Sequence, residues 1–152
     1  MALRNSTTPA AWAAALLAFL FLLLGAPRGH AQSAWKVVVH ESNPMSVMSR
    51  DQVARLFLKK ANAWPDGRPV APVDQREDAP VRVAFTREVL GKSIAAVKAY
   101  WQQQIFSGRA VPPPEESSDD RVARFVSEHP LGVGYVSPGA PVPGLKVLRL
   151  VD

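Results

Sequence analysis

The pattern of hydrophobic and polar residues divides the chain into short apolar runs and amphipathic stretches. The run from Trp35 to His40 is rich in β-branched residues and predicts a buried strand, which the turn residues 42–44 end. Residues 133–136 and 145–150 predict two more strands, separated by a loop rich in Pro and Gly. Residues 69–73 predict a short strand, and the two prolines in it favour a sheet edge or a strand end.

Four stretches have apolar residues at helical spacing. Ser49 opens the first through a capping box with Gln52, and Met48 is placed to pack against Val53. Val53, Leu56 and Phe57 form the apolar face of this helix. We expect its last turn to contain Lys59 and Lys60, where the helix dipole favours cations.

The other three helices follow the second strand. Asp78 is the expected N-cap of the second helix, which Gly91 ends. Ser93 caps the third helix and Ser117 starts the fourth. The expected buried faces are Val81, Phe85 and Val89 in the second helix, Ile94, Val97, Trp101 and Ile105 in the third, and Val122, Phe125 and Val126 in the fourth.

The predicted order is therefore β-α-β-α-α-α-β-β, without internal repeats. Strands that alternate with helices predict an α/β fold built in layers. The length of the chain after residue 31 is that of one domain, so we expect a single domain over residues 32–152.

The N-terminal segment is typical of a signal peptide. Arg4 precedes a wholly apolar run from Ala10 to Leu24, and Gly29-His30-Ala31 has the small-x-small pattern that a signal peptidase reads. The apolar run is shorter than the roughly 20 residues that span a bilayer. Residues 1–31 are therefore the expected signal peptide, and the protein is expected in the periplasm. The chain has no cysteine, which excludes a lipid anchor on Cys and any disulfide.

The charge of the mature chain is mildly positive. The whole chain carries +5, and loss of Arg4 and Arg28 lowers this to +3. Basic and acidic residues alternate along the chain and form no basic stripe, so nucleic acid is not an expected partner.

Several local patterns, taken in order, resemble a known family. They are the strand that ends in His40-Glu41-Ser42-Asn43-Pro44, the capped helix that ends at residues 56–58, Trp64 with Asp66-Gly67, Phe85 and Trp101 on successive helices, and Gly132-Val133-Gly134-Tyr135-Val136. In this order and spacing, residues 36–151 resemble the second lobe of type-2 periplasmic binding proteins, in particular the phosphate-binding proteins of ABC transporters. The resemblance implies a single three-layer α/β lobe.

The resemblance also implies what a complete receptor would need. Members of the family have two lobes that close on the ligand, and Lys36 lies where their chain enters the second lobe. The first lobe is therefore expected to be missing from this sequence. Closure around a ligand by a hinge needs two bodies.

The loop that holds phosphate in the family departs from its pattern here. The family has an Arg-x-Asp-Gly-Ser-Gly-Thr stretch before the helix that carries Phe85. Alignment on Phe85 puts Gln75 at the arginine and Glu77 at the acid, and puts residues 79–81 (Ala, Pro, Val) at the Ser, Gly and Thr positions. The two hydroxyls and one backbone N–H that would donate to an anion are lost.

A shift of one residue recovers a basic and an acidic side chain. Arg76 and Asp78 then take the family positions, and Arg82 near the helix start is a substitute cation. Arg76, Asp78 and Arg82 are therefore the candidate ligand-binding residues of a small-anion site. The alternative is that both arginines are solvated surface charges and Asp78 is only a helix cap.

Other chemistry has little support in the sequence. His40 and His129 are the histidines of the mature chain and lack the spacing of a metal site, and no serine lies in a hydrolase motif. We expect no catalytic residues, no metal and no cofactor. Trp101 is expected in the core, whereas Trp64 and Tyr100 are either core residues or exposed surfaces for stacking on a ligand.

Two functions remain open. The resemblance implies an exported, non-catalytic module like the substrate-binding proteins of phosphate ABC transporters, which binds inorganic phosphate or another small anion weakly. The alternative is a periplasmic interaction or sensor-accessory protein that consists of one lobe and binds no phosphate. Its partner would be a membrane transporter subunit or a sensor.

Overall fold

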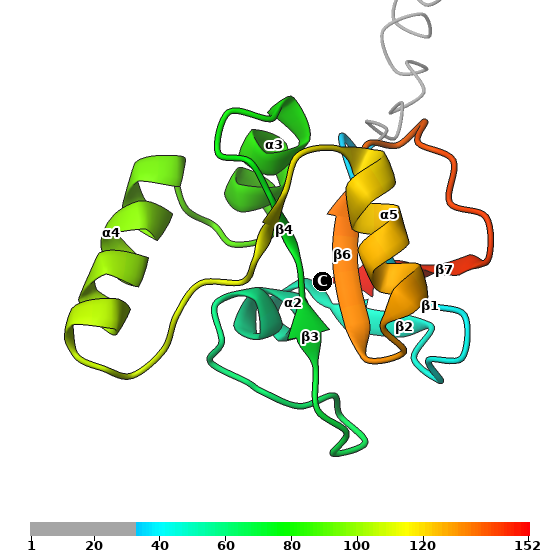
Figure 1. Cartoon of the computed structure of the whole chain (residues 1–152), viewed down its shortest axis with the longest axis horizontal. Coiled ribbons are helices and arrows are strands. Elements are labelled where there is room, and N and C mark those ends of the chain that lie inside the picture. The colour runs from blue at the N-terminus through cyan, green and yellow to red at the C-terminus, as the bar shows by residue number, and fades with distance from the viewer. Residues whose placement is uncertain (1–32) are drawn as a thin grey trace, which may run out of the picture. The chain divides into compact units, whose positions relative to one another are not determined.

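A five-stranded mixed sheet lies at the centre of the computed structural model, which describes residues 33–152 (Figure 1). The predicted signal peptide, residues 1–31, lies outside the described residues. The strand order is β2-β7-β1-β6-β3. The strands are β1 (Lys36–His40), β2 (Val47–Ser49), β3 (Ala71–Pro72), β6 (Gly132–Val136) and β7 (Leu145–Val151).

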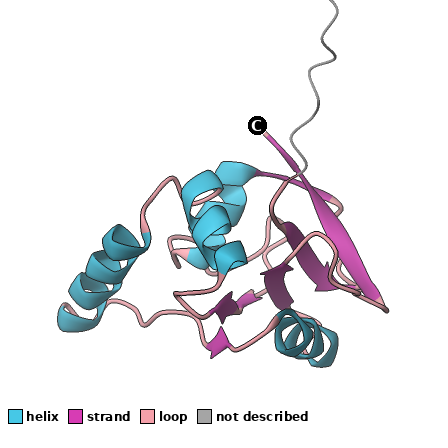
Figure 2. Ribbon diagram, turned by 90° about the horizontal axis from the view of Figure 1, so that it is seen from above, coloured by secondary structure: helices cyan, strands magenta, loops and turns pink. Residues whose placement is uncertain are grey.

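Helices cover both faces of this sheet (Figure 2). α2 (Arg50–Phe57) and α3 (Pro80–Glu88) pack on one face and α5 (Asp119–Glu128) packs on the other. The fourth helix, α4 (Ile94–Phe106), follows α3. β1 pairs antiparallel with β6 and β7, whereas the two edge strands pair parallel, β2 with β7 and β3 with β6. The order of the four helices is the predicted one, and the layered α/β arrangement is confirmed.

The three central residues of β1 are buried on both faces of the sheet. Val37 and Val39 face the larger core, which contains side chains of α2 and α3, and Val38 faces a smaller core under α5. All three are at most 1% exposed. Successive side chains of a strand point to opposite faces, so a continuous apolar run is needed where both faces are covered.

The larger core is built around stacked aromatic rings. The ring of Phe85 stacks on that of Tyr135 with 3.8 Å between their centroids, and Phe57 meets Phe85 edge-on at 4.9 Å. Trp35 also contacts Phe85 at a right angle. These contacts join α2 and α3 to β6, and Trp64 is 2% exposed in the same core. Trp64 is therefore a core residue and has no exposed face for a ligand.

Two helix starts are as predicted. Ser49 Oγ accepts a hydrogen bond from the Gln52 amide at 3.1 Å, and Gln52 Oε1 accepts one from the Ser49 amide at 2.8 Å, which completes the capping box. Met48 and Val53 belong to the same core cluster. Ser93 caps α4 by accepting from the Ala96 amide.

Three helix ends differ from the predictions. The N-cap of α3 is Ala79 rather than Asp78, because Pro80 has no N–H to be capped and its fixed φ suits the first helical position. The N-cap of α5 is Ser118 instead of Ser117. α2 ends at Phe57, and the chain then takes a positive φ of 50° at Lys59, so neither Lys59 nor Lys60 lies in its last turn.

The strand predicted at residues 69–73 is present but shorter than expected, as β3 (Ala71–Pro72). β3 forms an edge of the main sheet, as its prolines predicted, and after Val73 the chain enters a separate parallel pair, β4 (Asp74–Gln75) with β5 (Glu115–Glu116). β2, β4 and β5 were not predicted, because strands of two or three residues are too short to show a period.

α4 stands apart from the sheet at the end of two extended connections (Figure 1). Val97 and Trp101 are buried, and the Tyr100 hydroxyl donates to the Leu58 carbonyl at 2.8 Å. Ile105 was predicted on the buried face but is 53% exposed, and Phe106 beside it is 95% exposed. The buried stripe of this helix therefore ends one turn earlier than the periodicity predicted.

Candidate functional site

Arg76 and Asp78 lie in the loop between β4 and α3, where the sequence placed an anion site. Arg76 donates to Asp78 from Nε at 3.1 Å and from Nη2 at 2.6 Å. Both side chains are more than half exposed. The Asp78 carboxylate thus already binds the Arg76 guanidinium, which an anion would need as its partner. An exposed pair of this kind is nevertheless weak.

Arg82, the third candidate, is separated from that pair. Its side chain is 4% exposed and forms an ion pair with the buried carboxylate of Asp74. Its Nη1 also donates to the Gln75 carbonyl at 3.2 Å. The structure therefore does not bring the three predicted residues together, and Arg82 is not the solvated charge of the alternative interpretation.

Asp74 is the centre of this buried cluster. Its Oδ1 accepts from Arg82, from the Tyr135 hydroxyl and, at 2.9 Å, from the Gln75 amide. Burial raises the pKa of the Asp74 carboxyl, and the charge of Arg82 and the hydrogen bonds from Tyr135 and Gln75 offset part of that effect. Burial also raises the pKa of the Tyr135 hydroxyl, so this hydroxyl stays a donor.

Gln75 ties the cluster to α5. Its Nε2 donates to Asp119 Oδ1 at 2.8 Å and to the Tyr135 carbonyl at 3.0 Å. Asp119 also accepts from the Ser137 amide at 3.1 Å. Where the resemblance implies an arginine facing the ligand, this chain has a buried amide that joins β4, α5 and the end of β6.

The other positions of the family loop offer no replacement donors. Glu77, at the acid position, lies 3.5 Å from Lys98 of α4. Ala79, Pro80 and Val81 have no side-chain hydroxyl, and Pro80 has no amide hydrogen. The start of α3 therefore lacks two hydroxyl donors and one backbone N–H of the family pattern.

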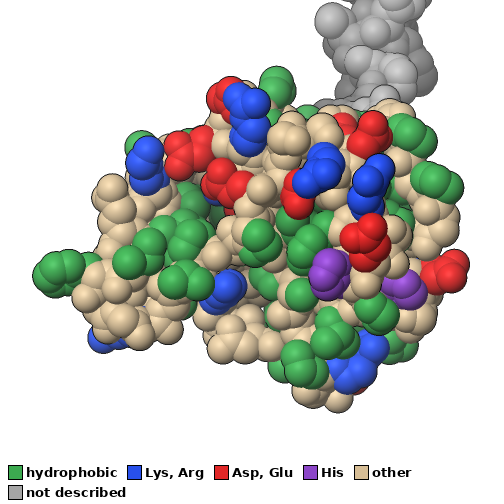
Figure 3. All heavy atoms as spheres, viewed as in Figure 1, with side chains coloured by type: hydrophobic (Ala, Val, Ile, Leu, Met, Phe, Trp, Pro, Cys, Tyr) green, Lys and Arg blue, Asp and Glu red, His purple; other side chains and the backbone are tan. Residues whose placement is uncertain are grey.

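A pocket of about 180 Å³ lies beside the buried cluster, between α4 and the β4–β5 pair. Figure 3 shows hydrophobic side chains in the hollow next to α4, with acidic side chains above them. The pocket is lined by Asp74, Glu77, Arg82, Ile94, Val97, Lys98, Trp101, Gln102, Ile105, Pro112 and Glu115. It therefore combines apolar side chains of α4 with charges of both signs, from β4, α3 and β5 and from Lys98 of α4.

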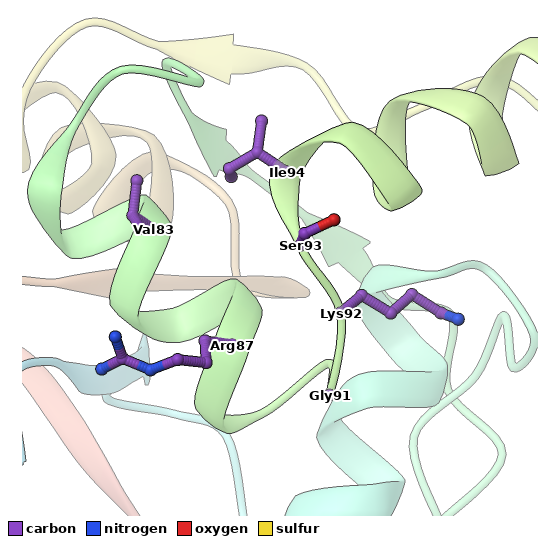
Figure 4. Close-up of a pocket in the computed structure, with 6 residues that line it drawn as sticks. All are labelled: Val83, Arg87, Gly91, Lys92, Ser93 and Ile94. Carbon is purple, nitrogen blue, oxygen red and sulfur yellow. The ribbon is translucent and has the colours of Figure 1, made fainter.

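A larger hollow of about 420 Å³ lies at the junction of α3 and α4. The cations that line it, Arg87 and Lys92, point in opposite directions (Figure 4). Arg87 is paired with Glu88 at 2.6 Å, and Ser93 Oγ accepts from the Ala96 amide. The charged side chains of this hollow therefore do not point toward a common position. The pocket beside Asp74 and Arg82 is the better candidate site.

Sequence reasoning did not identify Asp74, Tyr135 or Glu115 as members of the site. The signal for Asp74 was its place directly after the apolar residues 70–73, since a charge at the end of a buried run needs a partner when it is buried too. Tyr135 within a valine-rich strand was a similar signal.

Two features are absent from the part of the chain that the structure describes. No helix within residues 33–152 is both long enough and apolar enough to cross a bilayer. In the same range, no group of His, Asp and Glu side chains is arranged to hold a metal ion.

The sequence matches no protein-family model and no curated protein. The fold, in contrast, matches solved structures. A phosphate ABC transporter substrate-binding protein from Clostridium perfringens, solved with bound phosphate, superposes with a TM-score of 0.62 and 16% identity over 77% of this chain and 44% of that one. The fold is that of one lobe of a type-2 periplasmic binding protein.

Two further structures give the same result. An ABC-type phosphate transport receptor from Vibrio cholerae has a TM-score of 0.61 at 17% identity, and PstS from Borrelia burgdorferi has 0.61 at 12%. Each match covers 78% of this chain and 47% of the other. This chain thus spans less than half the length of these neighbours, and identities this low show the fold alone.

Proposed function

We propose that this protein is an exported, non-catalytic module of the periplasmic-binding-protein fold that does not hold phosphate in the loop before α3. The observation that carries the proposal is the ion pair between Arg82 and Asp74, which neutralises the buried cation of the candidate site. The solved structures of the same fold include a phosphate ABC transporter substrate-binding protein and an ABC-type phosphate transport receptor, which supports a binding role over catalysis.

The charges of the loop explain why phosphate would bind poorly. A phosphate that approached Arg82 would meet the carboxylate of Asp74 on the same guanidinium. At Arg76 it would compete with Asp78 in water, where both salt and solvent screen the attraction. Each missing hydrogen bond to a charged group costs about 1.5–3 kcal/mol, and about 1.4 kcal/mol is tenfold in affinity. Binding in the millimolar range or weaker is therefore expected.

Calorimetric titration of the exported protein with inorganic phosphate at physiological ionic strength tests this proposal. We expect no saturable heat below millimolar phosphate. The matched variants are Arg76→Ala, which removes the exposed cation, and Asp78→Asn, which frees it from its partner. Micromolar binding with one-to-one stoichiometry that disappears in Arg76→Ala would show that the chain is a phosphate receptor and that the proposal is wrong.

A second candidate function is contact with a protein partner, and the exposed end of α4 favours it. Ile105, Phe106 and Val111 are all more than half exposed there, and large exposed apolar side chains that gather on one surface often mark an interaction site. A membrane transporter subunit or a sensor is the class of partner. A photo-cross-linking residue at position 106 in intact cells would give one discrete adduct with such a subunit, whereas the same residue at exposed position 124 on α5 would give none.

A further inference from the structure

The pocket between α4 and the β4–β5 pair has two chemically different halves. Ile94, Val97, Trp101 and Ile105 of α4 form an apolar wall with Pro112. The opposite wall carries Asp74, Glu77, Arg82 and Glu115. A small, mainly apolar cavity with a few charged groups at one side is the usual form of a small-molecule site.

The charges of the polar wall do not cancel. Arg82 is neutralised by Asp74, and Lys98 lies 3.5 Å from Glu77. Glu115 has no ion pair or side-chain hydrogen bond within residues 33–152. Counted over the charged side chains that line the pocket (Asp74, Glu77, Arg82, Lys98 and Glu115), one negative charge remains, on Glu115.

Glu115 is exposed at the mouth of the pocket, and the surrounding protein shields only part of its carboxyl from water. Burial raises the pKa of its carboxyl, the charge of Arg82 lowers it, Asp74 and Glu77 raise it, and Lys98 lowers it. All four neighbouring charges therefore act on this carboxyl from the walls of the same pocket. A carboxylate in such surroundings is stabilised by a cation that brings its own apolar body.

Arg82 supplies a second feature of a binding site. Its side chain is 4% exposed and lines the pocket, and its Nε is a buried donor with no hydrogen-bond partner in the described part of the chain. Buried donors are normally satisfied. An oxygen atom on a bound molecule would satisfy this one.

We propose that the pocket binds a small organic amine whose ammonium group lies beside Glu115 and Glu77, whose apolar body packs against Trp101 and Ile105, and whose carbonyl oxygen accepts from Arg82. This inference rests on the proposed function, because it assigns a ligand class to the same non-catalytic module. An inorganic phosphate cannot take this place, since it has no apolar body and carries the same sign of charge as Glu115.

The probe is phenylalaninamide, which has an ammonium group, a carbonyl oxygen and one aromatic ring. Two analogues separate the contributions. N-acetylphenylalaninamide has no positive charge, and 2-phenylethylamine has no carbonyl. Calorimetric titration of the exported protein should give saturable one-to-one binding of phenylalaninamide, with each analogue weaker by roughly ten- to hundredfold.

Glu115→Gln is the decisive variant, because it keeps the shape of the side chain and removes the charge. We expect phenylalaninamide to bind roughly tenfold or more weakly to this variant. Ile105→Lys, at a residue that is 53% exposed, places a cation at the pocket and should also abolish binding. Glu128→Gln on the exposed surface of α5 is the matched control and should leave the affinity unchanged. Thermal unfolding of each variant checks that it is folded.

The outcomes separate this inference from the proposed function. No saturable binding of phenylalaninamide to the unmodified protein, or equal binding to the unmodified protein and Glu115→Gln, overturns the amine site. Tight phosphate binding in the separate titration overturns the proposed function instead. Equal affinity for phenylalaninamide and its N-acetyl analogue would also contradict the proposal. It would show that apolar contacts alone hold the molecule and that the positive charge of the ammonium group is not recognised.

Discussion

The guanidinium of Arg82 and the carboxylate of Asp74 form an ion pair inside the domain, with both side chains less than a tenth exposed. The pair joins the first turn of α3 to the strand β4. The Tyr135 hydroxyl and the Gln75 amide donate to the same carboxylate. Removal of one member would leave the other charge buried without a partner.

The first prediction concerns that pair. Asp74→Asn should destabilise the fold by about 3–5 kcal/mol, because Arg82 stays buried without a counter-charge. Asp78→Asn is the matched control, since it breaks the exposed pair with Arg76 and should cost less than about 1 kcal/mol. Urea unfolding followed by circular dichroism measures both. Similar midpoints for the two variants would mean that Asp74 and Arg82 are not buried together.

The second prediction compares two aromatic residues of α4. Trp101 is 6% exposed and belongs to the main core, whereas Phe106 is 95% exposed. Trp101→Ala should therefore cost about 3–5 kcal/mol, as for other buried aromatic residues. Phe106→Ala should change the free energy of unfolding by less than about 0.5 kcal/mol. If Phe106→Ala proved as damaging as Trp101→Ala, the last turn of α4 would have to be packed against the domain.

The parts of the fold that the sequence predicted are those that depend on near neighbours. The capping box of Ser49 and Gln52 involves residues three apart, and the continuous apolar run of β1 shows directly that both its faces are covered. The helix order and the edge position of β3 follow from the same local patterns. These features need no knowledge of how distant segments meet.

The candidate site was predicted less well because it depends on tertiary geometry. Arg82 and Asp74 meet because the chain leaves the main sheet after Val73 and forms a second pair with β5, which no local pattern indicates. The exposure of Ile105 has a similar cause, since periodicity identifies the face of a helix but not the point at which its neighbour ends.

The third prediction concerns processing of the N-terminus. The small-x-small pattern Gly29-His30-Ala31 after a short apolar run predicts that the exported chain begins at Gln32. Intact-mass measurement of protein from the periplasmic fraction should give the mass of residues 32–152. Replacement of Ala31 by a large residue should block cleavage and leave the longer chain with the membrane. A soluble periplasmic species that still carries Met1 would contradict the prediction.

The last prediction concerns the close approach of α5 to β6 at Gly134. A Cβ atom at this position would lie 2.5 Å from Cγ1 of Val122 and 3.0 Å from Cγ1 of Val73. Both valines are fully buried, and a β-branched side chain has little freedom to rotate away. Gly134→Ala should therefore force the helix off the sheet and destabilise the domain by about 1–3 kcal/mol.

Gly139, in the loop between β6 and β7, is the matched control for this substitution. A Cβ atom there would meet no other atom within 4 Å. Gly139→Ala should therefore leave the free energy of unfolding unchanged or raise it by up to about 1 kcal/mol, because alanine restricts the unfolded chain. Urea midpoints of the two variants and the parent decide the matter. A parent-like midpoint for Gly134→Ala would show that α5 does not lie against β6 at this glycine.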